Sequence, residues 1–255
     1  MEPPVEVDLG SAAAGWFTGR DVDAPAVPIG GQGNLSHRRP HRPGDLAAAR
    51  RAVGVATGTV PRHWHLLHQV HGAEVAVVDE NVPVGAELRG VDAAVTALVE
   101  RPLVVQAADC VPVLLAAHGG VGVAHAGRVG LLAGVLPAVV GALRELVGAT
   151  PLRAVIGPAI GPCCYEVPAA MREAASAVAP ELAATTSWGT PALDLPATAA
   201  AQLRAAGVEP VEVRGACTRC TPTSFSHRRD PASGRQFGLV VRRGRSLAGD
   251  AKAGV

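Results

Sequence analysis

The sequence predicts an α+β protein in which layered, mixed β-sheets carry their helices on the outside. Of its 255 residues, 48% are hydrophobic, and a chain of this length can bury a sizeable core. Short β-branched runs and helical runs follow one another without the regular alternation of a Rossmann fold. Neither GxGxxG after a strand nor a P-loop motif occurs, so nucleotide loops of those kinds are not expected.

Strands are predicted where β-branched or apolar runs are bounded by Gly, Pro or Asp. Three such runs are apolar almost throughout and are predicted to be central, buried strands: residues 103–106, 111–115 and 121–124. The other strands are predicted near residues 16–18 and at residues 74–79, 153–156, 208–213 and 236–243.

Two of the predicted helices carry clear capping signals. Residues 45–53 have high helix propensity, and Asp45 is predicted to be their N-cap. Residues 194–206 are predicted to be capped by Asp194 and ended by Gly207.

The other two helices contain proline. In residues 131–147 apolar side chains recur at three- and four-residue steps. Pro137 interrupts this pattern and predicts a kink or a break near Val135. Residues 168–178 begin with Pro168, which suits the first turn of a helix.

Charge and composition exclude several classes of partner. The net charge of +1 gives no electrostatic footprint for nucleic acid or for an anionic membrane. The densest basic run, residues 37–42, lies among Pro and Gly and is predicted to be a solvated loop. The apolar stretch at residues 121–143 contains His125, Arg128 and several glycines, which argues against a membrane span.

The chain is predicted to fold as one catalytic domain over residues 1–245, followed by a flexible tail at residues 246–255. Five cysteines without a regular framework, and an N-terminus without signal-peptide features, favour a reduced cytoplasmic compartment. We expect a monomer or a weak homo-oligomer.

Three segments place metal-capable side chains beside apolar runs. They are residues 68–72, 107–112 and 123–127, which contain His71, Cys110 and His125. Zinc binds imidazole nitrogen and thiolate sulfur readily, and copper accepts the same donors less exclusively. The spacing matches no general zinc pattern, and a buried Cys is often only a small hydrophobe. These residues alone therefore leave open both a metal site and plain packing.

Several motifs occur together in a characteristic order. They are HQVHG (68–72), ADCVPVL (108–114), HAG (125–127), IGPAIGPCCYEV (156–167), FSHRRD (225–230) and GRQ (234–236). From about Trp16 to Arg243 the chain resembles the YfiH/YlmD family, long labelled polyphenol oxidase or laccase-like and now regarded as purine nucleoside phosphorylases. The resemblance implies one zinc ion held by His71, Cys110 and His125, and a fold shared with cysteine-dependent hydrolases.

The resemblance also implies an activity. It is phosphorolysis of adenosine, inosine and S-methyl-5′-thioadenosine to free base and ribose 1-phosphate, with some adenosine deamination. Arginine binds phosphate bidentately, and the candidates are Arg51, Arg128, Arg228 and Arg229, of which Arg228 lies within a matched motif.

Other residues near these motifs are candidates for supporting roles. Asp109 and Gln69 adjoin the metal-capable side chains and are candidates for a proton shuttle, for orienting a ligand, or for a structural role. The family pattern implies that Cys217 lines the site and that Cys220 is incidental. The vicinal pair Cys163 and Cys164 is predicted to serve packing in a tight turn. Where the family usually reads His-Ala-Gly-Trp-Arg-Gly, this chain has Arg128 in place of Trp, which puts substrate contacts in question.

Three alternative functions remain. A metal-free cysteine hydrolase or deamidase would use Cys110 as nucleophile and His125 as base. A copper phenol oxidase would need further His-rich motifs, and only the isolated HWH at residues 63–65 is present. A non-catalytic metal-binding partner protein is the third.

Overall fold

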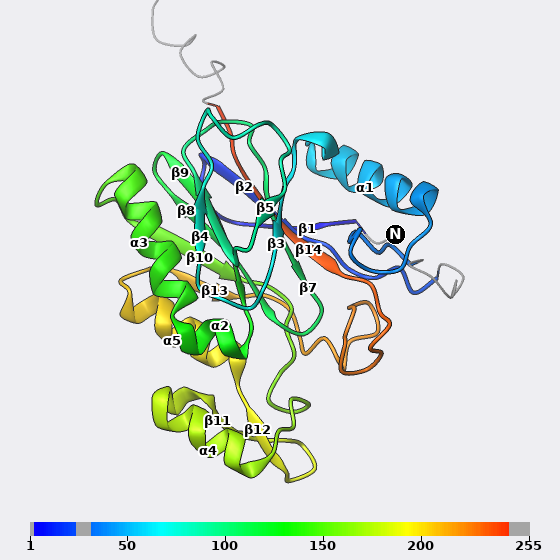
Figure 1. Ribbon diagram of the computed structural model, residues 1–255, viewed down its shortest axis with the longest axis vertical. Helices are drawn as coiled ribbons and strands as arrows, with labels where there is room; N and C mark the ends of the chain where they lie inside the picture. Colours follow the sequence, from blue (N-terminus) through cyan, green and yellow to red (C-terminus); the bar gives the residue numbers. More distant parts are fainter. Residues whose placement is uncertain (1–2, 24–31, 245–255) are drawn as a thin grey trace, which may run out of the picture.

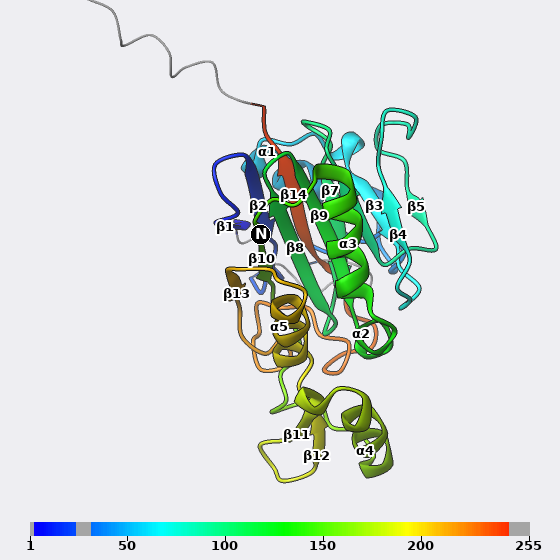
Figure 2. The ribbon, with the colours of Figure 1, turned by 90° about the vertical axis from the view of Figure 1, so that its left-hand side faces the viewer.

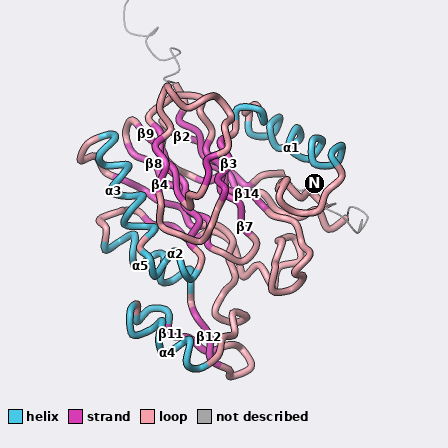
Figure 3. The backbone as a smooth tube through the Cα atoms, in the orientation of Figure 1, coloured by secondary structure: helices cyan, strands magenta, loops and turns pink. Residues whose placement is uncertain are grey.

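The computed structural model describes residues 3–23 and 32–244, and two six-stranded β-sheets form its centre (Figure 1). Parallel and antiparallel pairs occur in both sheets. Strands fill the interior and most helices lie outside them (Figure 3). The predicted α+β class with layered mixed sheets and outer helices is therefore confirmed.

The strand order shows how distant parts of the chain meet. The first sheet runs in the order β1 (Val5–Val7), β2 (Ala13–Phe17), β14 (Gln236–Arg242), β7 (Leu103–Ala107), β3 (His65–His68) and β5 (Leu88–Arg89). The second sheet runs in the order β13 (Val211–Val213), β10 (Leu152–Ile156), β8 (Val111–Ala117), β9 (Gly120–Ala126), β6 (Ala93–Thr96) and β4 (Val75–Val77).

Apolar side chains on both faces of the central strands hold the layers together. Because side chains alternate along a strand, Val113 and Leu115 of β8 pack under the helices, whereas Leu114 packs between the two sheets. In β14, Val240 joins the layer between the sheets and Leu239 the layer on the other side. The central strands are therefore buried on both faces, as their near-continuous apolar sequence predicts.

Helices cover the outer faces of both sheets. Helix α1 (Pro43–Thr57) lies over the first sheet, where Val53 packs with Val104 and Phe237. The outer face of the second sheet carries α2 (Arg128–Ala133), α3 (Val135–Val147) and α5 (Leu195–Ala205), as Figure 2 shows. Helix α4 (Ala169–Val178) and the hairpin of β11 (Ala183–Thr185) and β12 (Pro191–Leu193) project beyond the sheets at one end. Two short 3₁₀ helices, η1 (Pro61–His63) and η2 (Pro180–Leu182), complete the described elements.

The predicted break in residues 131–147 occurs at Gly134. This glycine has φ of 85° and separates α2 from α3. Pro137 falls in the first turn of α3, where the missing N–H has no intrahelical partner to lose.

Of the two predicted caps, one is confirmed and one is wrong. Asp194 caps α5, because its side chain accepts a hydrogen bond from the Ala197 N–H at 2.9 Å. Asp45, in contrast, lies inside the first turn of α1, which begins at Pro43 with Arg42 at the N-cap. Proline is favoured at the first helical position because its φ is already helical, so the N-cap lies three residues earlier than predicted.

Two strands beside the candidate site, β3 and β6, are not predicted by the sequence pattern. Strand β6 consists of two alanines, a valine and a threonine, and alanine has weak β propensity. Among the described residues no helix is both long and apolar enough to cross a bilayer. The predicted tail at residues 246–255 lies outside the described residues.

Candidate metal centre

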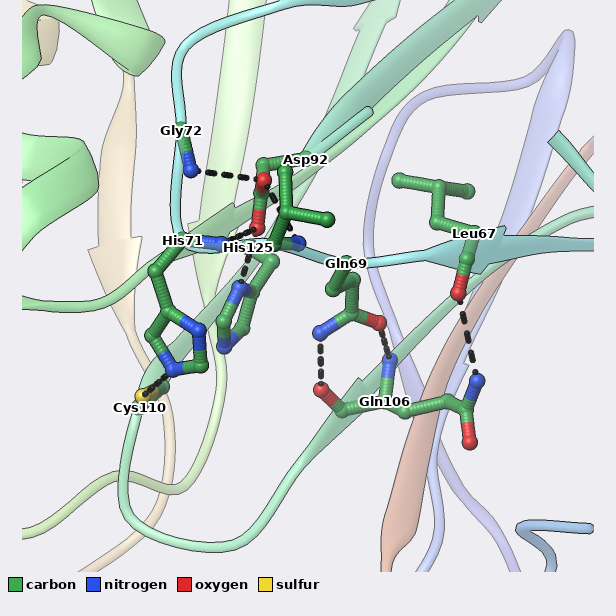
Figure 4. A network of polar contacts seen from close by, with 9 residues as sticks. Leu67, Gln69, His71, Gly72, Asp92, Gln106, Cys110 and His125 are labelled. Atoms are coloured by element: carbon green, nitrogen blue, oxygen red, sulfur yellow. Dashed lines mark hydrogen bonds and ion pairs between the residues drawn. The ribbon is translucent and has the colours of Figure 1, made fainter. Parts of the chain in front are cut away.

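The pairing of β8, β9 and β6 brings the candidate ligands to one edge of the second sheet. Pro112 of β8 lies opposite His125 of β9, so Cys110, just before β8, comes close to that imidazole. His71 follows the end of β3 and reaches the same point from the first sheet. The potential ligand atoms of the three side chains all lie within 4.8 Å of one another (Figure 4).

The spacing of these donors fits a zinc ion. The His71 Nε2 and Cys110 Sγ atoms are 3.8 Å apart, and the His71 and His125 rings meet edge to face with centroids 4.8 Å apart. Tetrahedral zinc with N and S ligands separates its donor atoms by roughly 3.3–3.8 Å. The three side chains therefore fit a shared metal with little movement.

Asp92, which is not predicted from the sequence, orients two of the three candidate ligands. Its side chain is fully buried, and its Oδ1 atom lies 2.7 Å from His125 Nδ1. That hydrogen bond leaves His125 Nε2 free for a metal. Its oxygens also accept the backbone N–H groups of Val70, His71 and Gly72 at 2.7–3.0 Å (Figure 4).

The backbone around the ligands adopts φ angles that residues other than glycine rarely adopt. His71 has φ of 64° and Asp109 has φ of 95°. Such residues cost about 1–3 kcal/mol each and persist where the surrounding structure holds them. A Cβ on Gly127 would lie 3.0 Å from both Cys110 Sγ and His71 Cδ2, so a side chain there would crowd the donors.

Electrostatics favour the thiolate form of Cys110. Burial raises the pKa of the Cys110 thiol, but the charge and hydrogen bonds of His125 and His71 outweigh this effect and lower the pKa to about 6. Burial lowers the pKa of His125, whereas the Cys110 thiolate and Asp92 raise it to about 9. Zinc binds the thiolate and the neutral imidazole, so metal binding here would displace the proton that His125 holds in the metal-free protein.

The three side chains lie at a cavity of about 500 Å³. Four arginines line it: Arg38, Arg39, Arg228 and Arg235. Residues 37–42 form a loop, as predicted, and Arg38 is exposed, but Arg38 and Arg39 also line this cavity. Arg38 forms an ion pair with Glu87 at 2.9 Å, and Arg39 donates to the carbonyls of Ser233 and Pro231.

Two of these arginines lie in an electrically crowded position. Burial lowers the pKa of Arg235, and the charge of Arg39 lowers it further. A bound anion would relieve that repulsion. Arg228 donates from its guanidinium to the Glu166 carbonyl at 2.8 Å and lies over the Tyr165 ring, 5.1 Å from the centroid.

Gln69 and Asp109 lie at the cavity, but their polar atoms are engaged. The Gln69 amide exchanges two hydrogen bonds with the backbone of Gln106, at 2.7 and 2.8 Å. The Asp109 carboxylate accepts from Thr218 Oγ1 and from the Arg228 N–H, both at 2.6 Å. These contacts favour positioning roles over proton transfer for both residues.

Other candidate residues lie elsewhere. Arg51 is exposed on α1 and does not line the cavity, so its predicted phosphate contact is not supported. The Arg229 guanidinium donates to the backbone carbonyls of its own loop. Arg128 begins α2 and lowers the pKa of Tyr165, which burial and the Cys110 charge raise. Cys217 does not line the cavity either. It lies among three other cysteines.

Comparison with known proteins gives consistent matches. The family model described as multi-copper polyphenol oxidoreductase laccase matches residues 15–243. A purine nucleoside phosphorylase from Streptomyces coelicolor is 46% identical over 88% of this chain and 93% of its own length. One from Mycobacterium tuberculosis strain H37Rv is 41% identical over 81% of this chain and 83% of its own length.

Solved structures agree with the sequence matches. YlmD from Geobacillus stearothermophilus superposes with a TM-score of 0.80 at 30% identity, covering 92% of this chain and 93% of that one. YfiH from Bacillus licheniformis superposes with a TM-score of 0.82 at 25% identity, covering 95% and 97%. The predicted resemblance is confirmed, and the chain belongs to the YfiH/YlmD family, whose family model carries the laccase description.

Proposed function

We propose that this chain is a zinc-dependent purine nucleoside phosphorylase. It would cleave adenosine, inosine and S-methyl-5′-thioadenosine with phosphate to give the free base and ribose 1-phosphate. The observation that carries this proposal is the group of His71, Cys110 and His125 at a cavity lined by four arginines. The names of the relatives from Streptomyces and Mycobacterium support it.

The arginines supply the phosphate site. Burial and the charge of Arg39 lower the pKa of Arg235, so a bound anion would stabilise the pair, and Arg228, from the same loop as Arg235, adds a third guanidinium. Charge-assisted, bidentate hydrogen bonds would fix the phosphate in the cavity and orient it toward C1′ of the ribose. Tyr165 lines the same cavity and offers an aromatic surface to the nucleoside.

His71, Cys110 and His125 would hold the zinc, and Asp92 would keep His125 in the tautomer that binds it. Zinc bound there supplies Lewis-acid catalysis, since three protein ligands leave a position for substrate or water. Adenosine deamination is the proposed side activity. The two-imidazole, one-thiolate donor set suits zinc and, less exclusively, copper.

The decisive test is chromatography of adenosine, inosine and S-methyl-5′-thioadenosine incubated with zinc-loaded protein, with and without phosphate. We expect phosphate-dependent release of base together with ribose 1-phosphate, and inosine or hypoxanthine from adenosine if deamination occurs. Unchanged nucleosides at high protein concentration would refute the phosphorylase and favour a non-catalytic partner protein. Oxygen consumption with a phenol by copper-loaded protein would instead support the oxidase that the family description names.

A cysteine hydrolase is the second candidate, and one observation favours it. Without metal, His125 acts as the base that takes the proton of Cys110, which leaves a thiolate nucleophile, an imidazolium that can return the proton, and the buried Asp92 carboxylate as the orienting group. Hydrolase activity should then increase when a chelator removes zinc and disappear after alkylation of Cys110. The phosphorylase should show the opposite response to chelation.

We also propose a cytoplasmic location and a monomeric or weakly associating state. Cell fractionation and light scattering test these two proposals separately.

A further inference from the structure

Four of the five cysteines gather at one place outside the cavity. Cys163 and Cys164 lie in a turn that follows β10, and Cys217 and Cys220 lie in a turn that follows β13. Strands β10 and β13 are parallel neighbours, with Ile156 opposite Val213. Their carboxyl ends therefore lie side by side, which brings the two turns together although they are distant in sequence.

The sulfur atoms have the spacing of a tetrahedral metal site. All four lie within 4.8 Å of one another, with Cys220 Sγ 3.3 Å from Cys164 Sγ and 3.9 Å from Cys163 Sγ. Zinc–sulfur bonds of about 2.3 Å in a tetrahedron place the sulfurs roughly 3.8 Å apart. A disulfide needs about 2.05 Å, so all five cysteines are free thiols in this geometry.

Packing alone does not account for this arrangement. Cys164 is buried, but Cys163 and Cys217 are only partly buried and Cys220 is exposed. The turn at Cys217 is held by the N–H groups of Cys220 and Thr221, which donate to the Cys217 carbonyl at 3.1 and 3.0 Å. Each of the two turns thus contributes two thiols to one point at the surface.

We propose that Cys163, Cys164, Cys217 and Cys220 form a second, structural zinc site with four thiolate ligands. Four soft sulfur donors in a tetrahedron are the set that zinc prefers in closed, structural sites. Binding replaces the thiol protons, which pass to solvent.

The site would clamp two turns that support the cavity. Tyr165, next to Cys164, lines the cavity. Thr218, next to Cys217, donates to the Asp109 carboxylate beside Cys110. A zinc ion joining these loops would fix both contacts without touching substrate.

Metal analysis of three forms of the full chain tests this proposal. Purified under reducing conditions with zinc, the wild-type protein should contain two zinc ions per chain. Cys110→Ala should keep one, and the double variant Cys217→Ser/Cys220→Ser should also keep one. Cobalt in Cys110→Ala should give tetrahedral bands with about four times the thiolate-to-cobalt charge-transfer intensity of cobalt in the double variant, since four sulfurs replace one.

Two results would overturn the proposal. One is a single zinc per wild-type chain that Cys110→Ala loses entirely. The other is a disulfide among the four cysteines in freshly reduced, zinc-loaded protein, detected by mass after alkylation. If the double variant does not fold, Cys110→Ala decides alone, because it retains all four sulfurs.

Discussion

The two sulfur-containing groups lie at the same edge of the second sheet but are built differently. At the His71–Cys110–His125 centre the donors are mixed, His125 sits in a strand, and the buried Asp92 holds both imidazole segments. At the four-cysteine group all donors are sulfur and all lie in turns. Only the first borders the arginine-lined cavity.

If both groups bind zinc as proposed, the difference between them separates two uses of the same metal. Three ligands held by strand ends and an internal carboxylate leave room for a reactant, whereas four thiolates complete a tetrahedron and leave none. Chemistry should therefore depend on the first group and loop order on the second.

The largest effect is expected from His71→Ala. His71 is exposed, so its removal should leave the fold intact but lower phosphorolysis by about a thousandfold or more, since losing one stabilising group already costs about 10²–10³. Steady-state rates with inosine and circular dichroism give the two measurements. His118→Ala, an exposed histidine in the β8–β9 turn, is the matched control. A fully active His71→Ala protein would show that the chemistry does not depend on the His71–Cys110–His125 centre.

Asp92→Asn should come next. The amide cannot accept from all four donors at once, so zinc affinity and activity should fall about 10–100-fold. Competition with a chromogenic chelator measures the affinity of the mixed centre, and the zinc of the four-cysteine group should not change. Asp79→Asn, an exposed turn residue, controls for the charge. An equal loss of zinc affinity at both groups would show that Asp92 acts on overall stability instead.

Sequence patterns predicted the strands that are strongly apolar and missed the contacts that need pairing register. Cys110 and His125 border apolar runs and lie within family motifs, so they could be identified as candidate ligands. Asp92 precedes an alanine-rich strand and meets His125 only because Ala93 pairs with Ala124. An isolated aspartate before a short apolar run was the available signal.

The cysteines and arginines illustrate the same limit. The pairs Cys163–Cys164 and Cys217–Cys220 become one group only through the parallel pairing of β10 and β13, which the sequence does not specify. Arg39 looks like part of a solvated basic run until the loop at Pro231–Ser233 accepts its hydrogen bonds. In both cases side chains from distant loops acquire a role by tertiary contact.

Arg228→Lys tests whether the cavity beside the His71–Cys110–His125 centre binds phosphate. Lysine keeps the charge but loses the planar fork, so KM for phosphate should rise about tenfold while kcat changes less. The initial rate as a function of phosphate concentration measures it. Arg51→Ala, an exposed arginine on α1, should leave KM unchanged. A rise in KM for the nucleoside alone would show that Arg228 contacts the nucleoside and not the phosphate.

Alkylation of metal-free protein should separate Cys110 from Cys163. With its pKa near 6, Cys110 is thiolate above that pH, so its iodoacetamide rate should rise through pH 6 and level off by about pH 7.5. Burial raises the pKa of Cys163, which should stay slow at neutral pH. At pH 7 Cys110 should react about fourfold faster than an ordinary thiol, because lower basicity offsets much of its larger thiolate fraction.

Peptide mapping identifies which cysteine is modified. Zinc should protect Cys110, and Cys110→Ser should remove the step at pH 6. A midpoint near pH 9 in the wild-type protein would show that His125 does not stabilise the thiolate.

The smallest effect is expected from Thr218→Val, which cuts the contact between the two regions. The Thr218 hydroxyl donates to Asp109 at 2.6 Å, and the residue lies between two of the clustered cysteines. Valine keeps the shape and removes the hydrogen bond, so only the placement of the Asp109 segment should change. Because a hydrogen bond contributes about 0.5 kcal/mol at the lower end of its net range, activity should fall twofold to threefold.

Zinc content should stay at two per Thr218→Val chain, as measured by elemental analysis. Thr221→Val, in the same loop, tests whether any threonine substitution there has the same effect. A loss of zinc from Thr218→Val would mean that the hydroxyl supports the cysteine turn itself. Unchanged activity would mean that the clamp and the catalytic centre operate independently, since this hydrogen bond is the direct side-chain link observed between the cysteine turn and the segment that carries Cys110.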